Sequence, residues 1–228
     1  MSNPKSLAQF EALIVFDVET TGLDCQRDRI IEFGAVKHSR KENGSDMLEE
    51  LDILIRLADG RSLSPEVSGL TGITDALLRE EGISEVQAAA QISSLISSPN
   101  TLLVAYNAQF DLCFLYWLLY RNGLETCLKQ VKLLDALTVY RDRQPYPHKL
   151  SDAIAAYGVD SSNTHRALDD ARATRELLCR MREEQDDLGS YANLFGYHPK
   201  YGVSGPRIPS VTYRPQSYDP TWKLYELE

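Results

Sequence analysis

The sequence lacks the features that mark zinc-finger, disulfide-rich and membrane-spanning proteins. Its four cysteines, Cys25, Cys113, Cys127 and Cys179, include no C-x-x-C pair, so they predict neither a structural zinc site nor a disulfide framework. No apolar run approaches the roughly 18 residues of a spanning helix, and the N-terminus carries no hydrophobic signal segment. We therefore expect a soluble, cytoplasmic protein with reduced thiols and no membrane contact.

The chain also lacks an excess of positive charge. Its 228 residues include 24 Lys plus Arg and 33 Asp plus Glu, which gives a formal net charge of -9. No whole-molecule positive field attracts a polyanion, so any nucleic-acid binding must be local or bridged by metal. Hydrophobic residues make up 43% of the chain, enough for a substantial core in one domain with an appendage.

What the sequence does contain is an apolar segment interrupted by two acids. Leu13 to Gly22 reads L-I-V-F-D-V-E-T-T-G, which predicts a central strand covered on both faces. Because strand side chains alternate, Asp17 and Glu19 must project from the same face. Buried carboxylates without a partner are costly or become protonated, and the segment contains no Lys or Arg. A divalent metal would supply the missing positive charge.

The remaining periodicity predicts an α/β domain in the order βββαβαβ followed by further helices. Asn107 follows the fourth strand and is expected to cap the next helix, which Gly123 ends. Val86 and Ala90 are expected on the apolar face of an earlier helix. The other strands are expected over residues 30–36, 51–57, 101–106 and 130–134, and the helices from 65, over 83–96, after 107, from 135, over 149–157 and over 166–185.

Beyond residue 185 the composition changes to aromatic residues interleaved with prolines, from Tyr191 to Tyr225 and including Tyr218 and Pro220. Regular helix is not expected there, and so many aromatics argue against a solvated tail. We expect a domain over residues 1–185 and an arm over residues 186–228 packed on it. The arm would be a stacking platform, a docking segment for a partner or a strap over the domain; a strap is favoured.

A third acid, Asp111, lies in N-A-Q-F-D within the first turn of the helix after the fourth strand. A helix N-terminus favours a carboxylate by itself, so an ordinary first-turn acid is one interpretation. If the fourth strand runs parallel beside the first, however, Asp111 lies next to Asp17 and Glu19.

The last predicted helix offers two adjacent acids, Asp169 and Asp170. Because a helix has about 3.6 residues per turn, Asp170 shares a face with apolar residues, whereas Asp169 belongs with Arg166 and Arg180 on the other face. A solvated salt bridge explains Asp169. An acid on the core-facing stripe needs a partner, so we favour Asp170 as the metal ligand.

His165 stands five residues before Asp170 at the start of this helix. Histidine titrates near neutrality, so one beside a metal cluster is a natural general base, although a loop histidine is also often a surface or capping group. His38, His148 and His198 have no such acidic neighbour in sequence. We expect those three to be structural or exposed.

The segments F-D-V-E-T-T-G, V-A-Y-N-A-Q-F-D and H-R-A-L-D-D-A resemble the three motifs of the DnaQ-like, DEDDh-type 3'-5' exonucleases. That family includes the proofreading subunit of bacterial replicative DNA polymerase, RNase T and oligoribonuclease. The likeness covers about residues 13–180, and S-G-L-T-G-I-T and K-L-L-D-A-L are similar to family linkers. It implies a ribonuclease H-like fold, with helices around a mixed five-stranded sheet of order 3-2-1-4-5 whose second strand is antiparallel.

Carried over by position, the resemblance implies that Asp17, Glu19, Asp111 and Asp170 hold two divalent ions and that His165 is the base. Mg²⁺ or Mn²⁺ suits an all-oxygen carboxylate site, whereas zinc prefers His and Cys. With two metals, one ion and the base would generate hydroxide and the other would stabilise the leaving 3'-oxygen. The products would be 5'-mononucleotides.

Substrate contacts are expected at Thr20, Leu23 and Asn107. Leu23 resembles the family position whose apolar side chain wedges against the terminal bases, although it could equally pack on the core. The main chain near Thr20 would meet the terminal nucleotide. A basic cluster, Arg141, Arg143, His148 and Lys149, would either track a single-stranded backbone or form a solvated loop.

The leading hypothesis is a metal-dependent 3'-5' exonuclease that acts on 3' ends of single-stranded or frayed DNA, with a DNA polymerase as a possible partner. A 3'-5' exoribonuclease of the same family is the alternative, and E-T-T-G followed by Leu23 looks nearer to the DNA-directed members. A catalytically silent module that binds nucleic acid or a protein is a third possibility. Such modules typically lose an acid or the histidine, and all five residues are present here.

Overall fold

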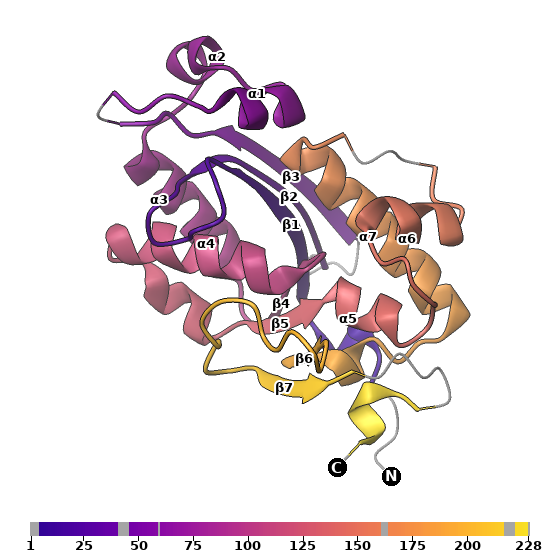
Figure 1. The fold of residues 1–228 in the computed structure, drawn as a ribbon. Coiled ribbons are helices and arrows are strands. Elements are labelled where there is room, and N and C mark those ends of the chain that lie inside the picture. Colours follow the sequence, from indigo (N-terminus) through magenta and orange to yellow (C-terminus); the bar gives the residue numbers. More distant parts are fainter. Residues whose placement is uncertain (1–4, 41–45, 59, 161–163, 217–221, 228) are drawn as a thin grey trace.

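The fold is built on a mixed five-stranded sheet, which confirms the expected order β3-β2-β1-β4-β5 (Figure 1). The computed structural model describes residues 5–40, 46–58, 60–160, 164–216 and 222–227. β2 is antiparallel to β1 and β3, whereas β4 is parallel to β1 and β5. The strands are β1 (Ala12–Thr20), β2 (Ile30–Arg40), β3 (Asp46–Leu54), β4 (Thr101–Ala105) and β5 (Lys132–Asp135).

Helices cover both faces of the sheet (Figure 1). On β1, Ile14, Phe16 and Val18 join a core with α3 and α4, whereas Val15 packs in a second core with α5, α6 and α7. None of the described helices is long and apolar enough to cross a membrane. The helices are α1 (Pro65–Thr71), α2 (Asp75–Glu80), α3 (Glu85–Ile96), α4 (Ala108–Arg121), α5 (Ala136–Arg141), α6 (Leu150–Ala156) and α7 (Ala167–Glu184).

The start of α4 differs from the expected side-chain cap. Asn107 is the residue before the helix, but its φ is +65° and its side chain makes no capping hydrogen bond. The Ala108 N–H instead donates to Asp135 Oδ1 at 3.1 Å, and the same oxygen accepts from the Leu137 N–H at 3.2 Å. Buried Asp135 therefore caps α4 and α5 together, which joins the ends of β4 and β5.

Several expected boundaries are shifted. The third strand, expected over 51–57, is longer and earlier, and the fifth begins at Lys132. The short helix α2 was not expected. In α3, Val86 and Ala90 are exposed because the buried face runs through other positions. Those buried residues are Ala88, Ala89, Ile92, Leu95 and Ile96.

The C-terminal arm packs on β5 and α5. Its strands β6 (Leu194–Tyr197) and β7 (Thr212–Pro215) form a two-stranded parallel sheet. The Asn193 N–H donates to Leu133 O at 2.7 Å, and the Gly196 N–H donates to Thr138 Oγ1 at 2.9 Å. Tyr218 and Pro220 lie outside the described residues. The described part of the arm is thus a packed element and not a solvated tail.

A glycine on β2 allows α7 to approach the sheet closely. Gly34 pairs with Asp17 of β1, and a Cβ atom at residue 34 would lie 2.0 Å from Leu168 N and 2.2 Å from Ala167 C. Backbone atoms cannot give way at such distances. The first turn of α7 therefore rests directly on the β2 backbone, opposite Asp17.

Candidate metal centre

Three acids meet where β1 and β4 end. Asp17 and Glu19 follow Val15 along the face of β1 that is covered by α7. Asp111 approaches from the first turn of α4, which follows β4, and is buried. Its Oδ1 accepts a hydrogen bond from the Val18 N–H at 3.2 Å, between the two strand acids. The parallel β1–β4 pair therefore makes these acids neighbours, although Asp111 lies 93 positions from Val18.

On α7 the two adjacent aspartates have different surroundings. Asp170 is buried, and its Oδ1 accepts from the Thr164 N–H at 3.1 Å. Asp169 lies at the surface, where its carboxylate pairs with Arg172 at 3.1 Å. The expected partners of Asp169 were wrong, because Arg166 pairs with a residue of β2 and Arg180 pairs with Glu176 and Glu183. Asp170 faces the core, as the helical periodicity predicted.

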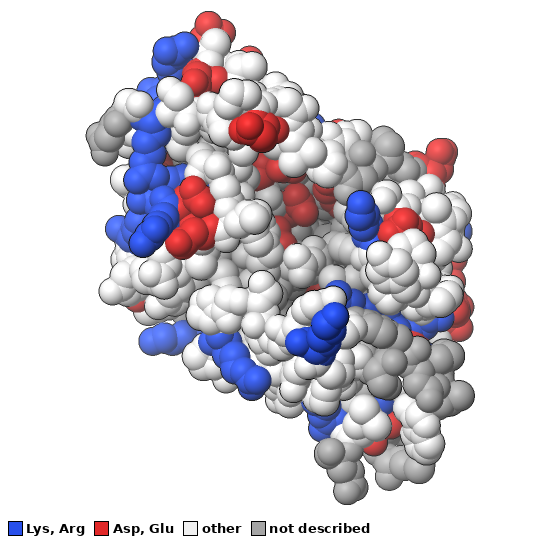
Figure 2. All heavy atoms as spheres, in the orientation of Figure 1, with Lys and Arg blue, Asp and Glu red and all other residues white. Residues whose placement is uncertain are grey.

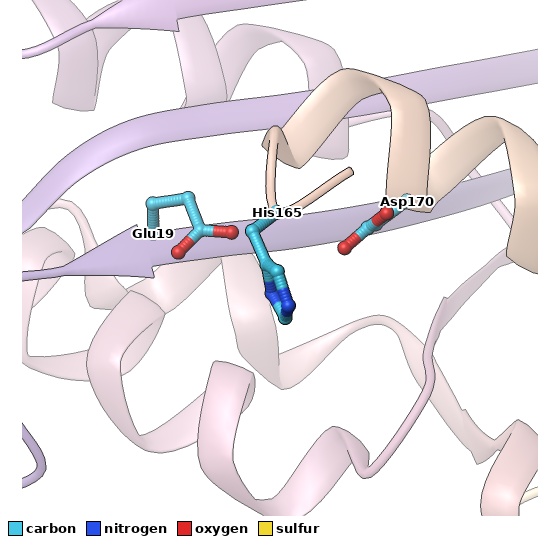
Figure 3. Close-up of side chains that lie close together, drawn as sticks. All are labelled: Glu19, His165 and Asp170. Atoms are coloured by element: carbon cyan, nitrogen blue, oxygen red, sulfur yellow. The ribbon is translucent and has the colours of Figure 1, made fainter. Parts of the chain in front are cut away.

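Glu19, His165 and Asp170 come close enough to share one ion (Figure 3). One potential ligand atom from each lies within 4.8 Å of the other two. They converge from β1, from the segment before α7 and from the first turn of α7 (Figure 3). His165 is exposed and has a φ of +54°, an uncommon backbone conformation for a residue with a side chain. Asp17 and Asp111 are not members of this set of three.

The acids carry more negative charge than their surroundings can neutralise. Burial, followed by repulsion from Asp170, raises the pKa of Glu19 to about 8, and burial raises the pKa of Asp111 to about 8. Burial raises the pKa of Asp170 to about 6, and burial together with Asp111, Asp170 and Glu19 raises the pKa of Asp17 well above its usual range. Each acid would ionise fully beside a cation. Clustered carboxylate oxygens are the ligands of hard divalent ions, so the residues present fit Mg²⁺ or Mn²⁺.

Glu32 of β2, which the sequence analysis did not identify, anchors the start of α7. It is fully buried and pairs across the sheet with Glu19. Its Oε1 accepts from Arg166 Nε at 2.8 Å and from a terminal guanidinium nitrogen at 2.6 Å, while its Oε2 accepts from the Ala167 N–H at 2.8 Å. Glu32 therefore replaces a local N-cap and holds the residues on the C-terminal side of His165. Its only sequence signal is an acid within the apolar strand I-I-E-F-G-A-V.

Replacing Glu32 with glutamine should lower the free energy of unfolding by about 1–3 kcal/mol, since charge-assisted hydrogen bonds to a buried carboxylate are lost and the amide nitrogen faces a donor. Urea denaturation measures the loss. Glu50→Gln is the control, because Glu50 pairs with Arg172 at the surface and such pairs contribute about 1 kcal/mol or less. Equal effects of the two substitutions would show that Glu32 does not anchor α7.

Of the three expected substrate-contacting residues, Thr20 and Leu23 lie just after Glu19, whereas Asn107 lies at the start of α4. Thr20 Oγ1 donates to Gly22 O at 2.6 Å, which holds the turn after Glu19. Leu23 in that turn is 87% exposed, so the interpretation that it packs on the core is wrong. Asn107 lines a pocket of about 180 Å³ between α4 and the C-terminal arm.

The basic cluster over residues 141–149 does not act as a unit. The Arg143 side chain is 2% exposed and forms ion pairs with Asp187 and Glu184, so it cannot track a nucleic-acid backbone. His148 Nε2 is 3.0 Å from Gln144 O. Lys149 is exposed, and its N–H donates to Asp152. The buried acid that holds Arg143 lies 44 positions away, beyond the reach of local sequence patterns.

Comparisons with known proteins agree on one kind of domain. A family model described as Exonuclease (RNase_T) matches residues 14–178. The DNA polymerase III PolC-type of Bacillus subtilis is 32% identical over 185 residues, which are 80% of this chain and 12% of that protein. The DNA polymerase III subunit epsilon of Treponema pallidum is 34% identical over 178 residues, 75% of this chain and 76% of that protein. The chain thus spans about an eighth of its PolC-type relatives.

Solved structures give the same result. The zinc-bound complex of E. coli exonuclease I with single-stranded DNA superimposes with a TM-score of 0.70 at 26% identity, covering 80% of this chain and 43% of that one. A complex of the same exonuclease with a dA16 oligonucleotide also gives 0.70 at 25% identity, over 79% and 42% of the two chains.

Proposed function

Because this chain belongs to the DnaQ-like 3'-5' exonuclease family, we propose that it is a metal-dependent enzyme that removes 5'-mononucleotides from the 3' end of single-stranded or frayed DNA. The observation that carries the proposal is the approach of Glu19, His165 and Asp170 to within 4.8 Å of one another beside Asp17 and Asp111. A catalytically silent module would not need this complete set.

The names of similar proteins support DNA over RNA. Relatives at 32% and 34% identity are DNA polymerase III proteins, and exonuclease I is described in complexes with single-stranded DNA and oligonucleotides. They also support a DNA polymerase as a partner. The exposed Leu23 fits a residue that wedges against terminal bases, and the nearby Thr20 main chain and Asn107 would contact the terminal nucleotide.

Each group has a separate part in the proposed hydrolysis. Two divalent ions held by Asp17, Glu19, Asp111 and Asp170 would neutralise phosphodiester charge and acidify the attacking water. His165 would accept the proton of that water at an imidazole nitrogen. The segment that carries His165 is held on one side by the Thr164 N–H bond to Asp170 and on the other by Glu32. These bonds reduce the reorganisation needed before proton transfer.

DNA and RNA oligonucleotides of matched sequence, labelled at the 5' end, test this proposal directly. With Mg²⁺ or Mn²⁺ we expect a ladder that shortens from the 3' end on DNA, and no products in EDTA. Asp170→Asn should abolish cleavage because it removes a buried carboxylate of the centre, whereas its surface neighbour provides the control Asp169→Asn, which should stay active. Cleavage in EDTA would contradict a metal-dependent mechanism. Degradation of RNA alone would assign the exoribonuclease activity instead.

A further inference from the structure

A pocket of about 340 Å³ at the start of β2 gathers four arginines in this acidic protein. Arg29, Arg56, Arg61 and Arg121 line it together with Glu85 and a few apolar residues. They come from the loop before β2, the segments after β3 and the end of α4. We propose that this arginine pocket binds a backbone phosphate of the nucleic-acid substrate outside the cleavage site, an inference that rests on the proposed function.

The guanidinium groups are held in place by the protein itself. One terminal nitrogen of Arg29 donates to the carbonyls of residues 26, 27 and 28 at 2.9–3.4 Å. Arg56 donates to Gly82 O at 2.7 Å, and Arg61 donates to Arg27 O at 2.9 Å. These carbonyl partners fix the side chains without neutralising their charge. Because these side chains are already ordered, a ligand that binds them costs less side-chain conformational entropy.

The pocket has a surplus of positive charge. Glu85 is the one acid among the residues that line it, and it is shared by Arg121 at 3.0 Å and Arg29 at 3.7 Å. Burial, with repulsion from Arg121 and Arg61, lowers the pKa of Arg29. One terminal nitrogen of Arg121 is buried without a hydrogen-bond partner among the described residues. An anion with several oxygen acceptors would relieve the repulsion between Arg29, Arg61 and Arg121.

The two nearby acids of the loop before β2 remove only part of this surplus, because Asp28 raises the pKa of Arg29 less than burial and the neighbouring arginines lower it. Asp24 pairs with the exposed Arg27 at 3.7 Å, outside the set of lining residues. Asp28 accepts from Thr21 Oγ1 at 3.1 Å and from the Asp24 N–H at 2.9 Å. Both carboxylates are thus used to shape the loop.

The position of the arginine pocket favours a nucleic acid as its ligand. The Thr21 N–H donates to Arg29 O at 2.9 Å, and Thr20 pairs with Ile30, so the pocket adjoins the turn that follows Glu19. Figure 2 shows Lys and Arg side chains along the left edge of a face whose central hollow exposes acidic groups. A chain whose 3' end reaches the acidic centre has further phosphates to place, and a net charge of -9 offers them little attraction elsewhere.

The double variant Arg56→Gln/Arg61→Gln tests the pocket, because both side chains are exposed and neither belongs to the metal centre. With dT20 as substrate, KM should rise about tenfold, and the slope of log(kcat/KM) against log[salt] should become shallower by about one to two. Hydrolysis of the p-nitrophenyl ester of thymidine 5'-monophosphate should be unchanged, since that substrate has no second nucleotide. A merely structural defect would affect both substrates.

Arg180→Gln/Arg182→Gln is the matched control, because it removes the same charge from the exposed C-terminal turns of α7. Its KM for dT20 should stay close to that of the wild type. An unchanged KM and salt slope in the pocket variant would overturn the proposal, and so would equal effects of both variants.

Fluorescence anisotropy of labelled dT20 separates the pocket from the proposed activity. If the wild type cleaves neither substrate, the exonuclease proposal fails, yet weaker dT20 binding by the pocket variant than by the control variant would still support the pocket. Equal dT20 binding by the two variants, or no binding by the wild type, would overturn it. If the pocket variant bound dT20 as well as the control variant but bound an acidic peptide more weakly than the control variant, the pocket would be assigned to a protein partner instead.

Discussion

Replacing Glu19 with glutamine is expected to reduce kcat by at least about 10³-fold, or roughly 4 kcal/mol in the activation barrier. The substitution keeps the shape of a side chain that approaches both His165 and Asp170, but it removes a negative charge that the proposed metal ions would require. Steady-state cleavage of a 5'-labelled oligonucleotide at saturating Mn²⁺ measures the effect. Activity within tenfold of the wild type would exclude Glu19 as a metal ligand.

The same substitution should stabilise the metal-free protein at alkaline pH. The pKa of Glu19 in the folded protein, about 8, lies above its ordinary value of 4.5. Protonated Glu19 therefore contributes its full share to the free energy of unfolding below about pH 4.5. This share is lost as the pH rises through about 8. In EDTA, the Tm of the wild type should therefore fall between about pH 5 and pH 9. Glu19→Gln should fall less. An identical decline in both proteins would show that repulsion at Glu19 does not destabilise the fold.

Replacing His165 with alanine is expected to lower kcat by about 10²- to 10⁴-fold, the usual contribution of a general base. The side chain is exposed, so folding should be little affected. His38→Ala, at a partly exposed position on β2, should retain activity and serves as the control.

A metal-binding measurement separates two roles of His165. Its ring lies within ligand distance of Glu19 and Asp170, so it could bind an ion as well as accept a proton. If it acts as the base, calorimetric titration with Mn²⁺ should give similar affinities for wild type and His165→Ala. A loss of affinity that parallels the loss of activity would make His165 a ligand.

Short-range periodicity determines the features that the sequence predicts correctly. The period of two in β1 places Asp17 and Glu19 on one face, and the period of the last helix separates Asp170 from Asp169. The sheet order, which the family resemblance implied, is also observed. These features depend on residues close in sequence or on a family topology, so one chain is enough to predict them.

What escaped prediction depends on contacts between residues distant in sequence. Glu32 anchors α7 by pairing with Arg166, which lies 134 positions away. The sequence of its own strand resembles that of an ordinary core strand. Asn107 looked like a helix cap, but Asp135, 27 positions beyond Ala108, provides that hydrogen bond. The four arginines of the pocket are likewise scattered between residues 29 and 121. No local pattern specifies such pairings.

Because residue 34 is glycine, α7 contacts β2 directly, and this contact sets the distance between the two halves of the candidate metal centre. Because the first turn of α7 touches the β2 backbone there, no flexible atom separates the strand that pairs with Asp17 from the helix that carries Asp170. A single added methyl group would displace the whole start of α7, moving Asp170, His165 and Arg166 together and not one ligand alone. The distance between the two halves of the site thus depends on glycine at position 34, so the buried acids tolerate little change at this contact.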